Sequence, residues 1–477
     1  MTQYTQTLAQ FATGTSYKQL PSEVVAKAKR LILDTLGNAV AGFSTSAAKL
    51  AIKTRQQLGG TPESTVLVNG FHTSSTAAAF CNATLASALE ADDTCLQLGH
   101  HGQCSFMPAL ALAESTGASG SDFLAAATLA YELGGRIASA ARHVVKAKDG
   151  SLQFNPSGGG VNWVVFPAVI GAGRMLHLDA LQMASALGIA GFSSTVPTGG
   201  RWNDPPRRHL KYNPYAFMAE SGTLAALLSS NGFTGDPDIF DGDISAVKAN
   251  WWQMAGCIGA EPQSAVGELG SRWLTLDASF KPYPSCRFTH GPIGLFEQIV
   301  AQHQLAIDDI EKVDIYSNQM MFAYHMDSAV VGSEADCQFS MPHLIAMAAL
   351  KIPAGPRWVS PEYWRSPQVE ALKRKVECHR YELADQAVVQ QLLDGRWEKV
   401  HSAVKVRAAG KTFEASAEYA GGDPFTPETA MSDTALFAKF RNSTAQGLAE
   451  FQIDRCIEIV MKLESQPDLK QLIGLLH

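Results

Sequence analysis

The sequence lacks the features that mark nucleic-acid-binding, membrane and secreted proteins. Charged residues make up only 17% of the 477 residues, the formal net charge is −7, and no long basic run is present to neutralise a phosphate backbone. No segment reaches the roughly 18 to 20 uninterrupted apolar residues that a membrane-spanning helix requires, and the N-terminus has no basic stretch followed by an apolar core. We therefore expect a cytoplasmic protein with neither nucleic acid nor a membrane as a partner.

Signatures of disulfides, metals and common cofactors are also missing. The eight cysteines show no paired spacing, which predicts reduced thiols. His100, His101 and Cys104 lie close together, but no HExxH or CxxC pattern accompanies them. The glycine-rich stretches at 156–163 and 267–273 match neither a dinucleotide fingerprint nor a phosphate loop. We expect no metal and no organic cofactor.

The sequence does contain a long series of segments that are rich in small residues and have apolar residues at helical spacing. Hydrophobic residues make up 46% of the chain, which suits tightly packed helices. One helix is predicted from Leu20 onwards, where Pro21 suits the first turn. Further helices are predicted at 74–89, 108–114, 122–138, 164–176, 181–189, 216–229 and 433–476.

The character of the sequence changes after Leu276. Two prolines in KPYPSC (281–286) break the helical pattern, and EKVDIYSN (311–318) predicts a short strand. Apolar and polar residues alternate on both sides of Ala409–Gly410, which predicts a hairpin. The predicted fold is mainly α, with a large all-helical domain from residues 1–275 and 426–477 and a smaller α+β lid domain from residues 276–425.

The first group of candidate site residues is an acidic stretch followed by a histidine pair. Glu90, Asp93 and Thr94 end one predicted helix, and His100 and His101 precede the next. Histidine is the side chain best suited to move protons near neutral pH, and a helix N-terminus favours anions. The alternative is an acidic helix end with a solvated loop, and the spacing alone does not separate the two.

Two further groups carry positive charge. Arg201, Arg207, Arg208 and Lys211 lie within eleven positions, and guanidinium and ammonium groups are what a carboxylate-rich substrate requires. A solvated basic loop is the alternative. The third group runs from Lys281 to His290, where prolines restrict the backbone and so hold these side chains in place. Within it we expect Cys286 to be a small buried residue and not a nucleophile.

Taken together, these motifs resemble the MmgE/PrpD family over nearly the whole chain. LILDTLGNAVAG (31–42) is similar to the family's N-terminal helix, and ALEADDT (88–94), HHG (100–102) and PALALAE (108–114) are similar to its acidic motif and histidine loop. The helical stretches at 173–191 and 221–243 follow the family pattern, and KPYPSCRFTHGPI (281–293) is similar to its lid signature. The resemblance implies a homodimer and a site between the two domains that needs no cofactor.

The resemblance also implies roles for individual residues. Lys211 and Lys281 match the family's two substrate lysines, and either His100 or His101 matches its catalytic histidine, with Asp93 orienting it and Thr94 binding substrate. Glu90 replaces the first aspartate of the family's acidic motif, and Asn162 stands where many members have histidine; Asn162 cannot carry a proton at neutral pH. The other predicted substrate-binding residues are Arg201, Arg208, His290 and Tyr324.

The family's reactions share a carbanion or enediolate beside a carboxylate, so we expect a lyase acting on a small di- or tricarboxylate. A histidine would move the proton and the lysines would stabilise the developing negative charge. A dehydratase of the 2-methylcitrate type is the first prediction. The alternatives are an isomerase, epimerase or decarboxylase acting on a related acid, of the iminodisuccinate epimerase or cis-aconitate decarboxylase type, and a non-catalytic carboxylate-binding protein.

Overall fold

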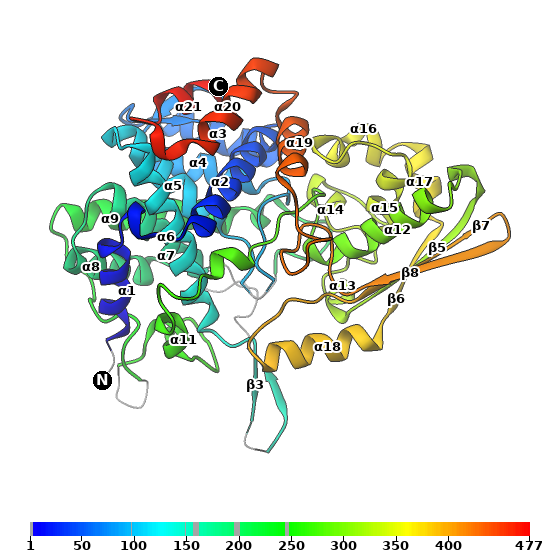
Figure 1. Cartoon of the computed structure of the whole chain (residues 1–477), viewed down its shortest axis with the longest axis horizontal. Helices are drawn as coiled ribbons and strands as arrows, with labels where there is room; N and C mark the ends of the chain where they lie inside the picture. The colour runs from blue at the N-terminus through cyan, green and yellow to red at the C-terminus, as the bar shows by residue number, and fades with distance from the viewer. Residues whose placement is uncertain (1–2, 97, 148, 156–161, 195–200, 244–247) are drawn as a thin grey trace.

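A computed structural model describes residues 3–96, 98–147, 149–155, 162–194, 201–243 and 248–477. Figure 1 shows a large helical part and, beside it, a smaller part built on a β-sheet. The predicted fold class, mainly α with a smaller α+β part, is confirmed. None of the helices within these ranges is both long and apolar enough to cross a membrane.

The large part is a stack of helices whose small residues allow close approach. Gly42 in the second helix lies against the main chain of Leu85 in the fourth, where a Cβ at position 42 would come within 1.9 Å of the Leu85 carbonyl oxygen. The helices are α1 (Tyr4–Gly14), α2 (Ser22–Gly42), α3 (Ser46–Leu58), α4 (Ser75–Ser87), α5 (Gly102–Thr116), α6 (Gly120–Ser139), α7 (Val165–Met175), α8 (Ala180–Ser193), α9 (Asn213–Ser230), α10 (Trp251–Met254) and α11 (Pro262–Val266).

Two small hairpins and the C-terminal helices complete this part. The hairpins are β1 (Ser64–Val66) with β2 (Phe71–Thr73), and β3 (Val144–Lys146) with β4 (Leu152–Phe154). As the spacing predicted, the chain end returns to helix: α19 (Asp433–Thr444) and α20 (Glu450–Met461) pack on α2, and α21 (Lys470–Leu475) packs on α20. One hydrophobic core therefore joins residues from Leu8 to Phe280 with residues from Leu436 to Leu476.

The smaller part is a four-stranded sheet with helices around it. The strand order is β6-β5-β7-β8, with β5 and β6 parallel and the other pairs antiparallel. The predicted strand is β5 (Ile310–Ser317), and the predicted hairpin is β7 (Ser402–Ala408) with β8 (Lys411–Ala417); β6 is Val376–Arg380. Ala409 and Gly410 have φ of 50° and 72°, which is the left-handed pair that a tight hairpin turn needs.

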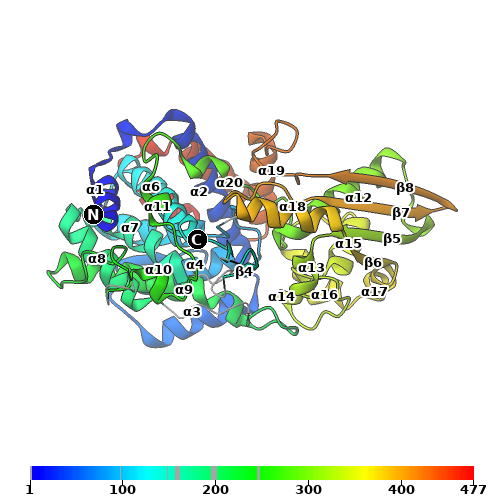
Figure 2. The ribbon, with the colours of Figure 1, turned by 90° about the horizontal axis from the view of Figure 1, so that it is seen from below.

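Short helices flank this sheet and carry a second core. They are α12 (His290–Gln302), α13 (Gln319–Ala323), α14 (Glu334–Cys337), α15 (Met341–Ala349), α16 (Pro361–Trp364), α17 (Pro367–Lys373) and α18 (Glu382–Leu393). The core they share with the sheet runs from Cys286 to Ala408. Figure 2 shows α18 lying across the junction with the helical part. The domain limits at 275/276 and 425/426 stay a prediction.

Candidate active site

The acidic stretch after α4 forms a buried loop that is tied down on several sides. Glu90 has a φ of 54°, a left-handed backbone that is uncommon for a residue with a side chain. The amide of Thr94 donates to the Ser279 carbonyl at 3.1 Å, and the Ser279 amide donates back at 2.7 Å. The side chain of Asn38 in α2 donates to the Ala91 carbonyl at 3.0 Å. The loop is therefore held between α2 and the segment that leads into the lid.

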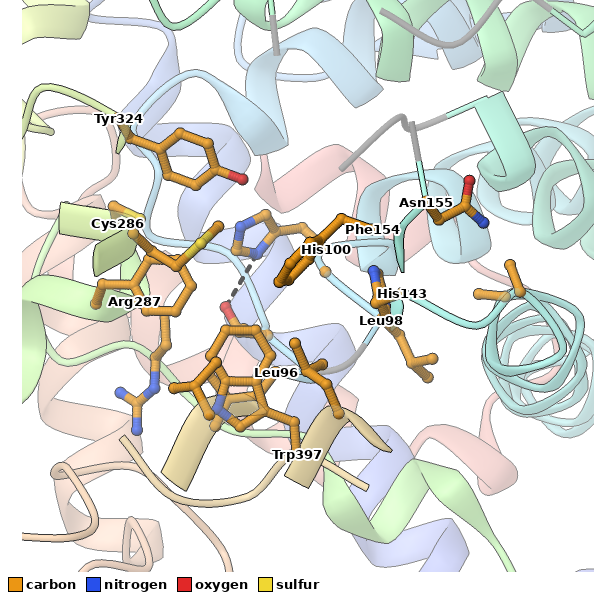
Figure 3. A pocket seen from close by; sticks show the side chains of 18 of the residues that line it. Leu96, Leu98, His100, His143, Phe154, Asn155, Cys286, Arg287, Tyr324 and Trp397 are labelled. Carbon is orange, nitrogen blue, oxygen red and sulfur yellow. Dashed lines mark hydrogen bonds between the residues drawn. The ribbon is translucent and has the colours of Figure 1, made fainter. Parts of the chain in front are cut away.

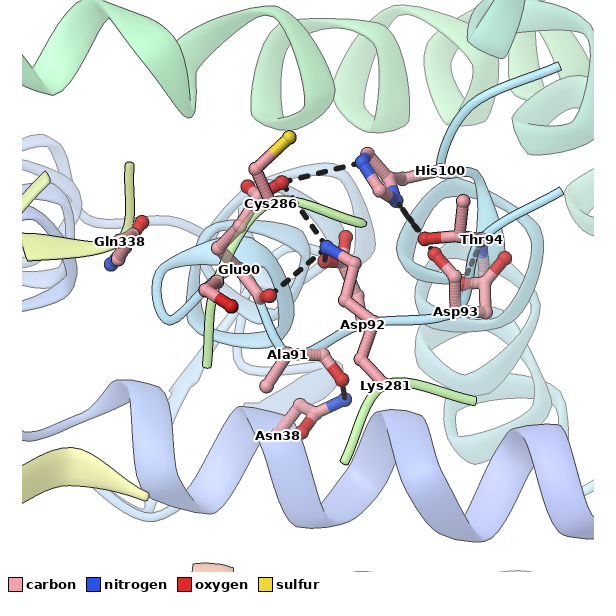
Figure 4. A network of polar contacts seen from close by, with 12 residues as sticks. Asn38, Glu90, Ala91, Asp92, Asp93, Thr94, His100, Lys281, Cys286 and Gln338 are labelled. Carbon is pink, nitrogen blue, oxygen red and sulfur yellow. Dashed lines mark hydrogen bonds and ion pairs between the residues drawn. The ribbon is translucent and has the colours of Figure 1, made fainter. Parts of the chain in front are cut away.

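Three basic side chains converge on the carboxylate of Glu90, and Figure 4 shows two of them, His100 and Lys281. The ammonium of Lys211, from the 3₁₀ turn His209–Lys211, forms an ion pair with it. The ammonium of Lys281 lies 3.1 Å from Oε1, and His100 Nε2 lies 3.3 Å from the same oxygen. Burial alone would raise the pKa of Glu90, but these cations hold it well below its usual value. Glu90 is thus a buried carboxylate that stays ionised.

His100 is held in one orientation with one ring nitrogen near Glu90. Its Nδ1 lies 2.7 Å from the Asp93 carbonyl and 2.9 Å from Thr94 Oγ1. Because a carbonyl only accepts, Nδ1 carries a proton, and any second proton sits on Nε2. Burial favours the neutral ring, but Asp92 and Glu90 outweigh burial and raise the pKa of His100. The neighbouring carboxylates therefore favour the imidazolium form, in which Nε2–H can donate a proton.

The predicted orienting role of Asp93 is taken by its main chain and not by its side chain. Its carboxylate instead accepts from the Gly102 amide at 2.9 Å and from the Tyr131 hydroxyl at 2.6 Å. A negative group at the N-terminus of α5 satisfies helix amides that otherwise lack partners. Asp93 therefore positions α5 through its side chain and His100 through its carbonyl.

The structure separates the two histidines that the sequence left open. His101 is fully buried, with Nε2 3.1 Å from the Tyr131 carbonyl and its ring stacked on Tyr131 at 3.9 Å. Burial lowers the pKa of His101, so it stays neutral and faces the core of the helical part. His100 is the candidate acid, because it alone of the pair lines the cavity described next.

A cavity of about 360 Å³ lies between the two parts of the molecule. Figure 3 shows side chains from both parts around it. Glu90, Thr94, His100 and Lys211 contribute polar groups, and more than half of the lining residues are apolar. The lid contributes Cys286, Arg287, Phe288, Gln319, Met320, Tyr324, Phe339, Val388, Val389, Leu392 and Trp397.

The predicted site residues are only partly brought together. Tyr324, which was predicted to bind substrate, lines the cavity, and burial raises its pKa to about 12. Lys281 is fully buried behind Glu90, where it also donates to the Glu90 carbonyl at 2.9 Å and lies 3.4 Å from Asp92. Burial would lower the pKa of Lys281, but these carboxylates raise it. Lys281 thus acts on the site through Glu90 and Asp92.

Four predicted substrate-binding residues do not line the cavity in the described part of the chain. Arg201 and Arg208 are exposed, whereas Arg207 turns inward and pairs with buried Asp336 at 3.1 Å. His290 is fully buried beside the Ser285 carbonyl at 3.0 Å, and burial holds its pKa well below the usual value. Buried Asn162 lies next to the lining residue Trp163 without lining the cavity itself.

Other lining residues were not singled out from the sequence. Arg287 lies inside KPYPSCRFTHGPI (281–293), the stretch that resembles the family's lid signature. Its guanidinium forms an ion pair with Asp423 and donates to the Gly421 carbonyl at 3.0 Å. Arg142, His143 and Trp397 come from segments without a recognisable motif. Cys286 lines the cavity, and burial raises the pKa of its thiol to about 11, which agrees with the predicted lack of a nucleophilic role.

Among the described residues, one group has the composition of a metal site, and it lies on the lid sheet away from the cavity. It consists of Asp314, Glu377 and His379 on β5 and β6. The ammonium of Lys312 already lies 2.9 Å from Asp314 and 2.6 Å from Glu377. The expectation that the site needs no metal or cofactor stays a prediction.

Known proteins resemble this chain over its whole length. The model of the MmgE/PrpD N-terminal domain matches residues 6–249, and that of the MmgE/PrpD C-terminal domain matches residues 283–465. A cis-aconitate decarboxylase of Aspergillus terreus is 24% identical, over 99% of this chain and 96% of the relative. A cis-aconitate decarboxylase of Mus musculus is 23% identical over 99% and 93%. A cis-aconitate decarboxylase-like protein of Aspergillus oryzae is 26% identical over 66% and 67%.

Proposed function

The chain belongs to the MmgE/PrpD family, and from this premise we propose that it is a cofactor-independent decarboxylase of a small polycarboxylate, with His100 as the proton donor. The family and the decarboxylases among its relatives support a lyase. The observation that carries the finer proposal is the placement of the His100 ring. Its Nδ1 lies 2.7 Å from the Asp93 carbonyl, its Nε2 lies 3.3 Å from Glu90 at the cavity, and the nearby carboxylates Asp92 and Glu90 raise its pKa.

In the proposed reaction, the bond between the α-carbon and the departing carboxylate breaks and carbon dioxide leaves. The electron pair stays on the α-carbon and spreads into a carboxylate that remains on the substrate. Lys211, whose side chain lines the cavity, stabilises that added charge electrostatically. Nε2–H of His100 then delivers a proton to the α-carbon, which leaves a neutral imidazole to be reprotonated from solvent.

The buried cluster behind the cavity keeps these groups in their charge states. Glu90 contacts both His100 and Lys211, and Lys281 offsets the negative charges of Glu90 and Asp92 from behind. A buried charge without a partner is costly, so the basic groups around Glu90 stabilise its ionised form, and Glu90 in turn stabilises their charged forms. The Glu90 carboxylate therefore sustains the acid form of His100 from 3.3 Å away.

Dehydration of the 2-methylcitrate type, the first prediction from the sequence, requires a base that removes an α-proton before hydroxide leaves. An imidazolium is the wrong form for that step, and the Glu90 carboxylate 3.3 Å from His100 Nε2 favours that form. This arrangement supports decarboxylation over dehydration and over epimerisation, which also begins with proton removal. Dehydration and epimerisation remain untested predictions.

The test is incubation of the protein with di- and tricarboxylates in heavy water, including cis-aconitate and 2-methylcitrate, followed by mass spectrometry. We expect carbon dioxide release from at least one acid and one deuteron bound to carbon in the product. The matched control is His100→Gln, which keeps a polar side chain but cannot donate a proton. Water loss, or deuterium exchange into the substrate without carbon dioxide release, would refute the decarboxylase assignment.

We also propose that the protein is a homodimer, which the family resemblance implies. Helices α8 and α9, which pack against each other, expose large apolar side chains, namely Leu181, Phe192, Phe217 and Leu224. Exposed apolar side chains of this size are typical of protein contacts when they gather in a patch. Light scattering at micromolar concentration is the measurement, and the mass of a single chain would contradict the proposal.

A further inference from the structure

One short segment of the lid contacts the chain on both sides of Lys211, and the chemistry proposed above makes no use of it. The segment is helix α14 (Glu334–Cys337) with Gln338 directly after it. Asp336 pairs with Arg207, four positions before Lys211, at 3.1 Å. Gln338 bonds to the residue that directly follows Lys211. The turn that carries Lys211 is therefore held by the lid before and after the lysine.

Gln338 is fully buried and uses both ends of its side-chain amide. Its Oε1 accepts from the Tyr212 hydroxyl at 2.6 Å, and its Nε2 donates to the Ala88 carbonyl at 2.9 Å. Ala88 lies two positions before Glu90. Burial raises the pKa of Tyr212 well above its usual value, so the hydroxyl keeps the proton that it donates. The amide thus sets the spacing between the Lys211 turn and the Glu90 loop.

The same contacts place aromatic rings around the Lys211 ammonium. Its Nζ lies 4.8 Å from the centre of the Tyr212 ring, 5.1 Å from that of Phe339 and 5.3 Å from that of Trp202. A cation is attracted to the face of an aromatic ring within about 6 Å of its centre. Phe339 directly follows Gln338 in the chain. Gln338 therefore helps to place two of the three rings, one through its side chain and one through its main chain.

Both partners of the Gln338 side chain belong to the helical part, although Gln338 itself belongs to the lid. Each of these groups is buried, and a buried polar group without a partner is costly. The lid and the helical part therefore fit together in one register at this point. That register brings the Lys211 ammonium to the carboxylate of Glu90, with which it forms an ion pair.

We propose that Gln338 is a positioning residue that fixes the Lys211 ammonium beside Glu90. It does so by joining Tyr212 to the Ala88 carbonyl. The inference rests on the proposed function in one respect, because it takes Lys211 as the group that stabilises the developing charge. Gln338 is not among the residues that line the described cavity, so it acts through Lys211 and not on the substrate.

The test is a double-mutant cycle that combines Gln338→Met with Lys211→Ala. Methionine has nearly the length of glutamine but cannot donate to the Ala88 carbonyl and accepts only weakly. Gln338→Met should reduce kcat/KM by at least about tenfold, because a displacement of about 1 Å within a site costs up to about a hundredfold. In the Lys211→Ala background it should change kcat/KM by less than about twofold, since the group that it positions is gone.

The matched control is Gln452→Met on α20. Gln452 also uses both ends of its amide, donating to the Leu475 carbonyl at 3.0 Å and accepting from the Ala449 amide at 2.9 Å, and it does not line the described cavity. The control should lower the melting temperature and change kcat/KM by less than about twofold. If Gln338→Met does not fold, Tyr212→Phe takes its place in the cycle, because it removes one of the two hydrogen bonds and keeps the ring.

The outcomes separate this inference from the proposed function. Wild-type kcat/KM in Gln338→Met, an equal loss in the control, or a loss by the same factor with and without Lys211 overturns the positioning role, while the decarboxylase assignment stands. If no acid releases carbon dioxide, the decarboxylase assignment fails, and the unfolding free energies of the four proteins of the cycle decide the inference. Losses of stability that do not add support it, because both side chains then act on one contact, and losses that add overturn it.

Discussion

The two ends of the cavity are stabilised by different physical effects. At the polar end, buried Glu90, Lys211 and Lys281 and half-buried His100 form one group of ion pairs. At the apolar end, Leu392 and its neighbours offer area and shape without a fixed partner. Removing one buried charge leaves another unpaired, whereas trimming an apolar side chain only reduces contact area. Changes at the polar end should therefore alter turnover or stability, and changes at the apolar end should alter selectivity.

The largest effect is expected at His100. His100→Gln removes the proton donor and should reduce kcat/KM by about a thousandfold on the true substrate, which is the usual scale of general acid catalysis. The comparison is His101→Gln, which removes a ring that faces the helical core. That variant should lower the melting temperature and leave the turnover of the folded protein close to wild type. Equal loss of turnover in both variants would contradict the assignment of His100.

The two lysines should differ although both contact Glu90. Lys211 lines the cavity, so Lys211→Ala should reduce kcat/KM by at least about a hundredfold, or roughly 2.7 kcal/mol of transition-state stabilisation. Its melting temperature is expected to fall less than that of Lys281→Ala, because Lys281 and His100 still pair with Glu90. Steady-state kinetics and thermal unfolding of the same preparation test both points. Near-wild-type kinetics would remove Lys211 from the site.

Lys281 is fully buried, and its loss should appear first as a loss of stability. Lys281→Ala leaves Glu90 and Asp92 without their ammonium partner, which should lower the free energy of unfolding by about 3 to 5 kcal/mol. Denaturant titration measures the change. Combining it with Glu90→Gln removes part of the unpaired charge and should recover some of that stability. A double variant less stable than Lys281→Ala would contradict a role through charge pairing.

The pH dependence of turnover should move when Glu90 loses its charge. His100 donates its proton as an imidazolium, so activity is present below its pKa and is lost as the pH rises through it. Glu90 is one of the groups that raise the pKa of His100, so in Glu90→Gln the loss should begin at a lower pH than in the wild type. The profile of kcat/KM against pH tests this. An unchanged alkaline limb would mean that a different group is the acid.

The smallest effect is expected outside both ends of the cavity. Arg208 was predicted to bind substrate, but its side chain is exposed and does not line the cavity. Arg208→Ala should therefore change kcat/KM by no more than about twofold, the scale of ordinary surface substitutions. The matched variant is Lys211→Ala, three positions away. A loss with Arg208→Ala comparable to that with Lys211→Ala would show that Arg208 reaches the substrate after all.

Many of the helices and the hairpin could be predicted, because each of them depends on residues that are close together in the sequence. Apolar residues at helical spacing indicated α2, α4 and α6, and the alternation around Ala409–Gly410 indicated the β7–β8 hairpin. Both patterns report which face of a local element is buried. The family motifs also identified Glu90, Lys211 and Lys281, which the structure brings together although they come from distant segments.

The sequence by itself determined which residue types are available near the reacting groups, and only the tertiary structure decided which of them face the cavity. His100 and His101 are adjacent, yet one contacts Glu90 and the other stacks on Tyr131. Arg207 and Arg208 diverge in the same way, one toward Asp336 and one toward solvent. The cavity brings Trp397 close to Leu96, far apart in the chain. Such contacts depend on how helices, strands and loops pack against one another. The pattern of residues within one segment does not show which other segment packs against it.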